Sequence, residues 1–151
     1  MIETVFERAY ALAEEAFQAD EVPVGAVIFE TATDKIVAEA RNRTEERHDP
    51  LAHAEILCIR SACEKLGLKR LTGYSIFVTL EPCSMCAGAI GWARLDHLYY
   101  GADDPKTGAV NQGPCVFTHP QTHHKIEITG GIHAPECAQL MTRFFRQKRQ
   151  K

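Results

Sequence analysis

The sequence predicts an α/β fold in which helices cover both faces of one sheet. Segments rich in β-branched and aromatic residues alternate with segments whose apolar residues recur every three or four positions. The length of 151 residues suits one compact core, and no linker rich in Pro, Gly or Ser divides the chain. We therefore expect a single domain over residues 1–151.

The first elements expected are a helix and a hairpin. Apolar residues follow helical spacing over residues 2–17, as a helix with one face on a sheet requires. Two apolar segments, 25–29 and 36–40, are separated by the turn-like residues 31–34, which predicts an antiparallel hairpin. The polar residues 43–50 then predict a loop.

The middle of the chain predicts a helix, a strand and a second helix. Residues 53–66 again show helical spacing, and Gly67 is a suitable C-terminal stop. Residues 74–80 are rich in β-branched and aromatic side chains, which is typical of a buried central strand. Because proline suits the first helical turn, Pro82 predicts a helix that runs through Ala93.

The last third of the chain predicts two short strands, a long loop and a final helix. Residues 98–100 and 125–129 are expected to be strands, and the irregular residues 103–120 between them are long enough to indicate a functional loop. The final helix is expected to begin near Pro135. Its predicted apolar stripe consists of Cys137, Leu140, Met141, Phe144 and Phe145.

Composition and charge exclude several classes of protein. The longest apolar runs are far shorter than the roughly 20 residues of a membrane span. Residues 1–4 form neither a basic leader nor an apolar signal segment, so we expect a cytoplasmic protein with no membrane partner. The six cysteines are then more typical of free thiols and metal ligands than of disulfides. The formal charge of −3 argues against a protein that coats nucleic acid.

One basic segment departs from this balance. Residues 143–151 contain no acidic residue and five basic ones, namely Arg143, Arg146, Lys148, Arg149 and Lys151. Such a cluster favours a phosphate-rich partner. The alternative is a solvated helix end whose cations complement the helix dipole.

Two short motifs, at residues 53–55 (His-Ala-Glu) and 82–86 (Pro-Cys-Ser-Met-Cys), point to chemistry. Each lies at the predicted start of a helix, and both should open on the same edge of the sheet. Cys83 and Cys86 are three positions apart, so their sulfurs would lie on one helix face within reach of a single ion. The dipole at a helix N-terminus also favours thiolates over thiols.

Two thiolates and one imidazole make an incomplete set of metal ligands. A structural zinc usually has four protein ligands, whereas His53, Cys83 and Cys86 supply three and leave a position for water. Zinc lowers the pKa of such a water to about 7. Glu55 is then predicted to be the general acid/base and not a ligand. Iron in the same site, a redox dithiol and half of a structural zinc site are the alternatives.

The remaining cysteines and histidines show no comparable spacing. Cys58, Cys63 and Cys137 fall on predicted helices and are expected to be small core residues. The other histidines are expected at the surface, with a contact from His123 or His124 to a substrate left open.

The order H-x-E followed by P-C-x-x-C resembles the signature of zinc deaminases that act on nucleobases. Further segments resemble the bacterial tRNA-specific adenosine deaminases, and the resemblance covers nearly the whole chain. These segments are residues 21–27, 42–43, 49–55, 79–83, 101–102, 104–109 and 144–146. The sequence departs from the family pattern at residues 110–117 and at Arg143.

The resemblance implies a fold, a cofactor and a reaction. The fold would be the cytidine deaminase-like three-layer α/β/α sandwich with a five-stranded mixed sheet. Each subunit of a homodimer would hold one zinc ion. The wobble adenosine of a tRNA anticodon loop would be flipped into the pocket and converted to inosine, as zinc-bound hydroxide attacks C6 and Glu55 shuttles the protons.

The resemblance also implies substrate contacts. The nucleotide would be held by Asn42 and the backbone amide of Ala54, the pocket lined by Pro23 and Val24, and the RNA met by Asp104, Lys106, Arg146, Lys148 and Arg149. Deamination of a free nucleobase or nucleoside, such as guanine or cytosine, is the main alternative. A zinc-stabilised RNA-binding protein without catalysis is a third.

Overall fold

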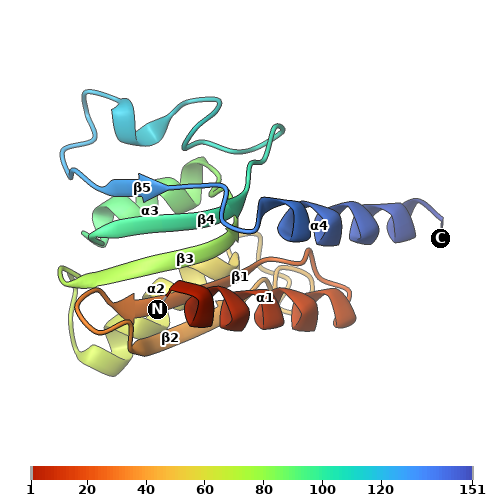
Figure 1. Ribbon diagram of the computed structural model, residues 1–151, viewed down its shortest axis with the longest axis horizontal. Helices are drawn as coiled ribbons and strands as arrows, with labels where there is room; N and C mark the ends of the chain where they lie inside the picture. The colour runs from red at the N-terminus through yellow and green to blue at the C-terminus, as the bar shows by residue number, and fades with distance from the viewer. Residues whose placement is uncertain (1, 151) are drawn as a thin grey trace.

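The computed structural model describes residues 2–150 and contains one five-stranded mixed sheet (Figure 1). The strands are β1 (Gly25–Glu30), β2 (Ile36–Arg41), β3 (Tyr74–Leu80), β4 (His97–Ala102) and β5 (Glu127–Thr129). Their order across the sheet is β2-β1-β3-β4-β5. β1 is antiparallel to both of its neighbours, whereas β4 is parallel to β3 and to β5. The expected mixed sheet is confirmed.

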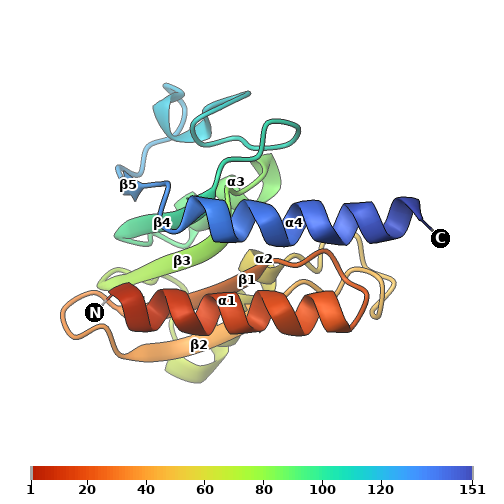
Figure 2. The same ribbon diagram turned by 45° about the vertical axis from the view of Figure 1, so that its right-hand side comes forward.

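Helices cover both faces of the sheet (Figures 1 and 2). The helices are α1 (Ile2–Gln18), α2 (Ala54–Leu66), α3 (Ser84–Trp92) and α4 (Ala134–Arg149). Because successive strand residues point to opposite faces, Val27 joins the buried cluster under α1, and Ile28 joins the cluster shared with α2 and α3. The predicted three-layer sandwich is therefore confirmed.

Two helix starts differ from the predicted ones. His53 and Cys83 are N-cap residues with extended backbone, at φ −70°, ψ 150° and φ −73°, ψ 176°, so α2 begins at Ala54 and α3 at Ser84. Neither side chain caps its own helix. Both are therefore available for other contacts beyond the helix ends. At the other end of α2, Gly67 adopts φ 66° and its N–H bonds the carbonyl of Cys63, as expected for a helix stop.

α4 runs past the end of the sheet (Figure 1). Cys137, in the first turn of α4, joins the buried cluster under α1. Phe144, farther along the helix, meets Phe17 of α1 at 5.9 Å between ring centroids. Phe145, the last residue of the predicted apolar stripe, is 42% exposed. This part of the helix has no strand beneath it that would bury a second aromatic ring. The expected strand at 125–129 is also shorter, because pairing with β4 begins at Glu127.

Among residues 2–150, the structure contains no helix long and apolar enough to cross a bilayer.

Candidate functional site

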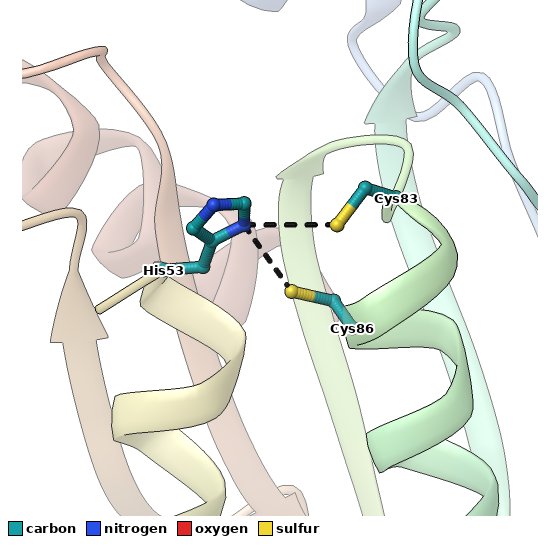
Figure 3. A group of neighbouring side chains, drawn as sticks. All are labelled: His53, Cys83 and Cys86. Atoms are coloured by element: carbon teal, nitrogen blue, oxygen red, sulfur yellow. Dashed lines mark hydrogen bonds between the residues drawn. The ribbon is translucent and has the colours of Figure 1, made fainter. Parts of the chain in front are cut away.

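His53, Cys83 and Cys86 meet between the first turns of α2 and α3 (Figure 3). The Nδ1 atom of His53 lies 3.7 Å from the Sγ atom of Cys83 and 3.4 Å from that of Cys86. A tetrahedral zinc ion with Zn–N near 2.0 Å and Zn–S near 2.3 Å would set nitrogen and sulfur about 3.5 Å apart. The donor set and its spacing therefore fit one tetrahedral metal ion. No second group of this kind occurs among residues 2–150.

The two thiols of this group are electrostatically unequal. The hydrogen bond from Cys86, helped by the imidazole of His53, lowers the pKa of Cys83 to about 4 although burial opposes the shift. The same hydrogen bond and burial raise the pKa of Cys86. A divalent cation would remove the remaining proton, because a coordinating thiol is deprotonated outright. Metal binding should therefore release protons.

Glu55 lies in the first turn of α2 beside the three ligand residues. Its side chain is buried, and burial raises its pKa to about 7. A carboxyl group that titrates near neutrality can both accept and return a proton. Glu55 is not part of the group that could hold a metal.

His53, Glu55 and Cys83 line a cleft of about 720 Å³. This volume lies within the range of roughly 300–1,000 Å³ that is usual for ligand sites. Of the expected substrate-contact residues, the cleft contains Val24, Asn42, Ala54, Asp104, Lys106 and Arg149. The sequence-predicted residues thus come together from both halves of the chain.

Pro23 is an exception to this agreement. It is buried, but the residues that line the cleft are its neighbours, Val22 and Val24. The N–H of Val24 donates to the carbonyl of Val22 at 2.9 Å, which makes a three-residue turn centred on Pro23. Val22 therefore takes the place expected for Pro23.

Asp104 has hydrogen-bond partners within its own loop. Its carboxylate accepts hydrogen bonds from the backbone N–H groups of Lys106 and Thr107, at 3.0 and 3.2 Å, and from the Thr107 hydroxyl at 2.6 Å. These contacts close a local turn at the rim of the cleft. The carboxylate of Asp104 shapes the loop, and the loop as a whole borders the cleft.

The basic tail divides into residues with different surroundings. Arg149 lines the cleft, whereas Arg146 is exposed outside it. The Nζ atom of Lys148 pairs with the Oδ1 atom of Asp20 at 2.7 Å. Lys148, which was expected to contact RNA phosphate, therefore forms an ion pair within the chain. Lys151 lies outside the described residues.

His123 and His124 lie away from the cleft of their own chain. Both line a separate hollow of about 130 Å³ beside α3, next to Trp92. This hollow shares no lining residue with the cleft. Neither histidine is placed to contact a substrate held beside Glu55 of the same chain.

Sequence reasoning missed one wall of the cleft and two buried carboxylates. Met141, Thr142 and Phe145 of α4 line the cleft, although the helical period had shown Met141 and Phe145 only as members of one apolar stripe. An apolar stripe has the same period whether it faces a core or a cleft. The carboxylates belong to Glu21 and Glu81, and each accepts hydrogen bonds from a loop beside the cleft.

Comparisons with known proteins agree with this geometry. The chain matches the family of MafB19-like deaminases over residues 2–149. A tRNA-specific adenosine deaminase of Agrobacterium fabrum is 48% identical over 143 residues, which cover 95% of this chain and 93% of the relative. The chain belongs to the family of tRNA-specific adenosine deaminases. The family member of Bacillus subtilis is 38% identical, with 99% of this chain and 91% of the relative covered. The family resemblance seen in the sequence is confirmed, and the chain is an enzyme of the deaminase class.

Solved structures support the same family and also show how widely its fold is shared. A chain from a study of A-to-I editing by tRNA:A34 deaminases at the wobble position of transfer RNA has a TM-score of 0.88 and 46% identity, covering 91% of this chain and 99% of that one. A guanine deaminase of Nitrosomonas europaea reaches a TM-score of 0.83 at 22% identity, covering 94% and 83%. A guanine deaminase of Bacillus subtilis is 42% identical with a TM-score of 0.62, covering 67% and 64%. The fold alone therefore does not decide the substrate.

Proposed function

We propose that this deaminase hydrolyses the wobble adenosine of a tRNA anticodon to inosine and releases ammonia. The observation that carries the proposal is the 48% identity, over 95% of the chain, to a tRNA-specific adenosine deaminase. The cleft is consistent with a nucleotide held in a longer RNA, because it extends from Glu55 to Arg149 near the end of α4.

We assign zinc to His53, Cys83 and Cys86, with one ion per chain. Two thiolates and one imidazole at tetrahedral spacing are a ligand set that suits zinc. When bound, zinc would lower the pKa of a water molecule to about 7 and so supply a nucleophile at neutral pH.

Glu55 would move the protons of the reaction. It would take a proton from the attacking water and deliver it to the purine ring. It would then take the remaining proton from the new C6 hydroxyl and pass it to the amino group, which leaves as ammonia as the carbonyl of inosine forms. The pKa of about 7 suits both steps, because the group must accept and donate within one cycle.

The base would be held by polar groups between apolar walls. Ala54 is the first residue of α2, and its backbone N–H belongs to the orphan donors of a helix N-terminus, so it can donate to the purine. The side chain of Asn42, which also lines the cleft, would bind the nucleotide, and Val22 and Val24 would cover its apolar surface.

We also propose a homodimer in the cytoplasm. Trp92 at the end of α3 is 82% exposed, and aromatic residues are enriched at protein interfaces. The free cysteines suit a reducing compartment. Sedimentation at several protein concentrations tests the dimer, and Trp92→Glu should shift the protein toward monomer.

Guanine deamination is the second candidate, because a Bacillus subtilis guanine deaminase is 42% identical over 67% of this chain. One assay separates the two. An anticodon stem-loop with adenosine at the wobble position is incubated with the zinc-loaded protein, beside guanine, cytosine, adenine and their nucleosides. We expect inosine in the stem-loop and no turnover of the free compounds. Turnover of a free base without turnover of the RNA would reject the proposal.

A further inference from the structure

The buried carboxylate of Glu81 connects the metal site to the loop on one side of the cleft. Glu81 follows β3 directly, lies two residues before Cys83, and is only 2% exposed. Each of the two carboxylate oxygens accepts two hydrogen bonds. The donors are the N–H of Asp104 at 3.0 Å, Nε2 of Gln112 at 2.7 Å, the N–H of Val110 at 3.0 Å and the N–H of Asn111 at 2.8 Å.

These donors come from both ends of one loop, residues 104–112. Residues 104–107 line the cleft, and residues 110–112 form the other end of the loop. Between them, Gly108 lies so close to Glu81 that a Cβ atom there would be 2.5 Å from the carboxylate. The N–H of Ala109 also donates to the carbonyl of Pro82 at 3.0 Å. The loop is therefore laid directly on the segment that leads to Cys83.

Gln112 adds a contact that the backbone alone does not provide. Its amide is the single side-chain donor among the four. This side chain therefore completes the set of donors around a buried charge.

We propose that Glu81 is a positioning residue for deamination. It fixes the 104–107 side of the cleft relative to Cys83, so that the substrate-binding wall is ordered before the substrate arrives. This inference rests on the proposed function for its kinetic effect, but the ordering of the loop can be measured without any substrate.

Glu81→Gln would keep the size of the side chain and replace one acceptor oxygen by an NH₂ group that faces two donors. The loop would then be ordered in only a fraction of molecules, and apparent substrate affinity falls by that fraction. We expect KM for the stem-loop to rise about tenfold, which corresponds to about 1.4 kcal/mol. The value of kcat should change less than about threefold, because Glu55 and the metal ligands stay in place.

Glu21 provides a matched control. It is another fully buried carboxylate and accepts hydrogen bonds from the N–H groups of Glu45 and Glu46, at 3.0 and 2.7 Å. Those donors belong to a different loop, residues 43–50. Glu21→Gln should therefore loosen that loop and leave residues 104–112 unchanged.

The experiment combines amide hydrogen exchange, zinc content and kinetics on the intact protein. In Glu81→Gln, exchange at Asp104, Val110 and Asn111 should become at least about tenfold faster, with the amides of residues 45 and 46 unchanged. Glu21→Gln should show the reverse pattern. Zinc content should equal that of the wild type in both variants. In Glu81→Gln, KM should rise while kcat changes little.

Unchanged exchange in the 104–112 loop of Glu81→Gln would overturn the proposal, as would a loss of kcat at constant KM. If Glu81→Gln does not fold, Gln112→Ala removes one donor and leaves the carboxylate in place. That variant should show the same changes at about one third of the size, and wild-type exchange and KM would overturn the proposal. If the stem-loop is not a substrate, KM is measured on whichever free base is turned over, while the exchange pattern still tests Glu81.

Discussion

The backbone state of two cap residues determines which groups are available for chemistry. His53 and Cys83 have extended backbone and make no side-chain cap to their own helices. The ring of His53 therefore meets the thiols of Cys83 and Cys86 across the gap between α2 and α3 (Figure 3). Had either residue been inside its helix, its side chain would have followed the helix surface instead.

Glu55→Gln should abolish most turnover and leave the metal in place. An amide keeps the shape of the side chain but cannot carry protons, and loss of general acid/base catalysis typically costs about 10²–10⁴ in rate. Stem-loop turnover and zinc content are measured on the same preparation. Glu64→Gln, an exposed change on the same helix, should match the wild type in both. Loss of zinc from Glu55→Gln would make Glu55 a ligand and contradict its assigned role.

At this scale the sequence predicted the residue types well and their partners less well. The spacing of Cys83 and Cys86 was sufficient, because an N-cap residue and the third residue of its helix lie close enough to share one ion, although Cys83 itself has extended backbone. Glu81 could not be predicted, because its donors lie more than 20 positions away in a loop of irregular structure. A charged residue directly after a buried strand was the one signal available.

Among the elements, α1 is packed on β1 at a position that only glycine can occupy. A Cβ atom at Gly25 would contact the carbonyl oxygen of Ala9 and lie 2.8 Å from the nitrogen of Ala13. Both are backbone atoms of α1, so the whole helix would have to move.

Gly25→Ala should therefore lower the free energy of unfolding by about 3 kcal/mol, at the upper end of overpacking costs. Gly88→Ala is the matched control, because a Cβ atom at that position of α3 has no neighbour within 4 Å. It should be neutral or stabilise by up to about 1 kcal/mol, since alanine favours a helix interior. Urea denaturation measures both values. Equal losses of stability would show that the contact with α1 is not the cause.

His133 links the starts of α1 and α4. Its ring stacks on Phe6 at 4.1 Å between centroids, and its nitrogens contact Glu3 at 2.9 Å and Glu136 at 2.7 Å. The hydrogen bonds to Glu3 and Glu136 raise the pKa of His133, and the bond to His133 lowers the pKa of Glu136.

The stability supplied by this link should depend on pH. Because the pKa of His133 is raised in the folded state, its protonated ring stabilises the fold. This contribution is fully present below the usual pKa of 6.5 and is lost as pH rises through the folded-state pKa. The lowered pKa of Glu136 makes its contribution present above the usual 4.5 and lost as pH falls further. The difference in Tm between wild type and His133→Gln should therefore be largest between pH 4.5 and pH 6.5 and should shrink as pH rises above 6.5. The exposed change His123→Gln is the control. A difference that grows with pH would contradict the link.

Across the whole molecule, the cleft is assembled from segments that no local pattern connects. The alternation of strands and helices was enough to predict the three layers, because each element needs a partner for its apolar face. The wall formed by α4 could not be predicted, because the path of a helix past the sheet depends on tertiary packing. The same packing separates Arg149 in the cleft from Lys148, which pairs with Asp20.

Arg149 and Lys148 should therefore differ in their effect on RNA binding. Each phosphate contact to a single strand contributes about 0.7 to the slope of log K against log salt. Arg149→Ala should reduce that slope by about this amount for an anticodon stem-loop, whereas Lys148→Ala should leave it unchanged. Fluorescence anisotropy over a salt series gives both slopes. Equal effects would show that the ion pair with Asp20 does not withhold Lys148 from the RNA.

The proposed deamination depends most on the metal centre formed by His53, Cys83 and Cys86. X-ray absorption at the zinc edge of the purified protein tests it directly. It should show one zinc per chain with two sulfur ligands near 2.3 Å, one imidazole nitrogen near 2.0 Å and one further light atom. A shell of four sulfurs, a shell without sulfur, or protein that binds no zinc when zinc is supplied would contradict the account.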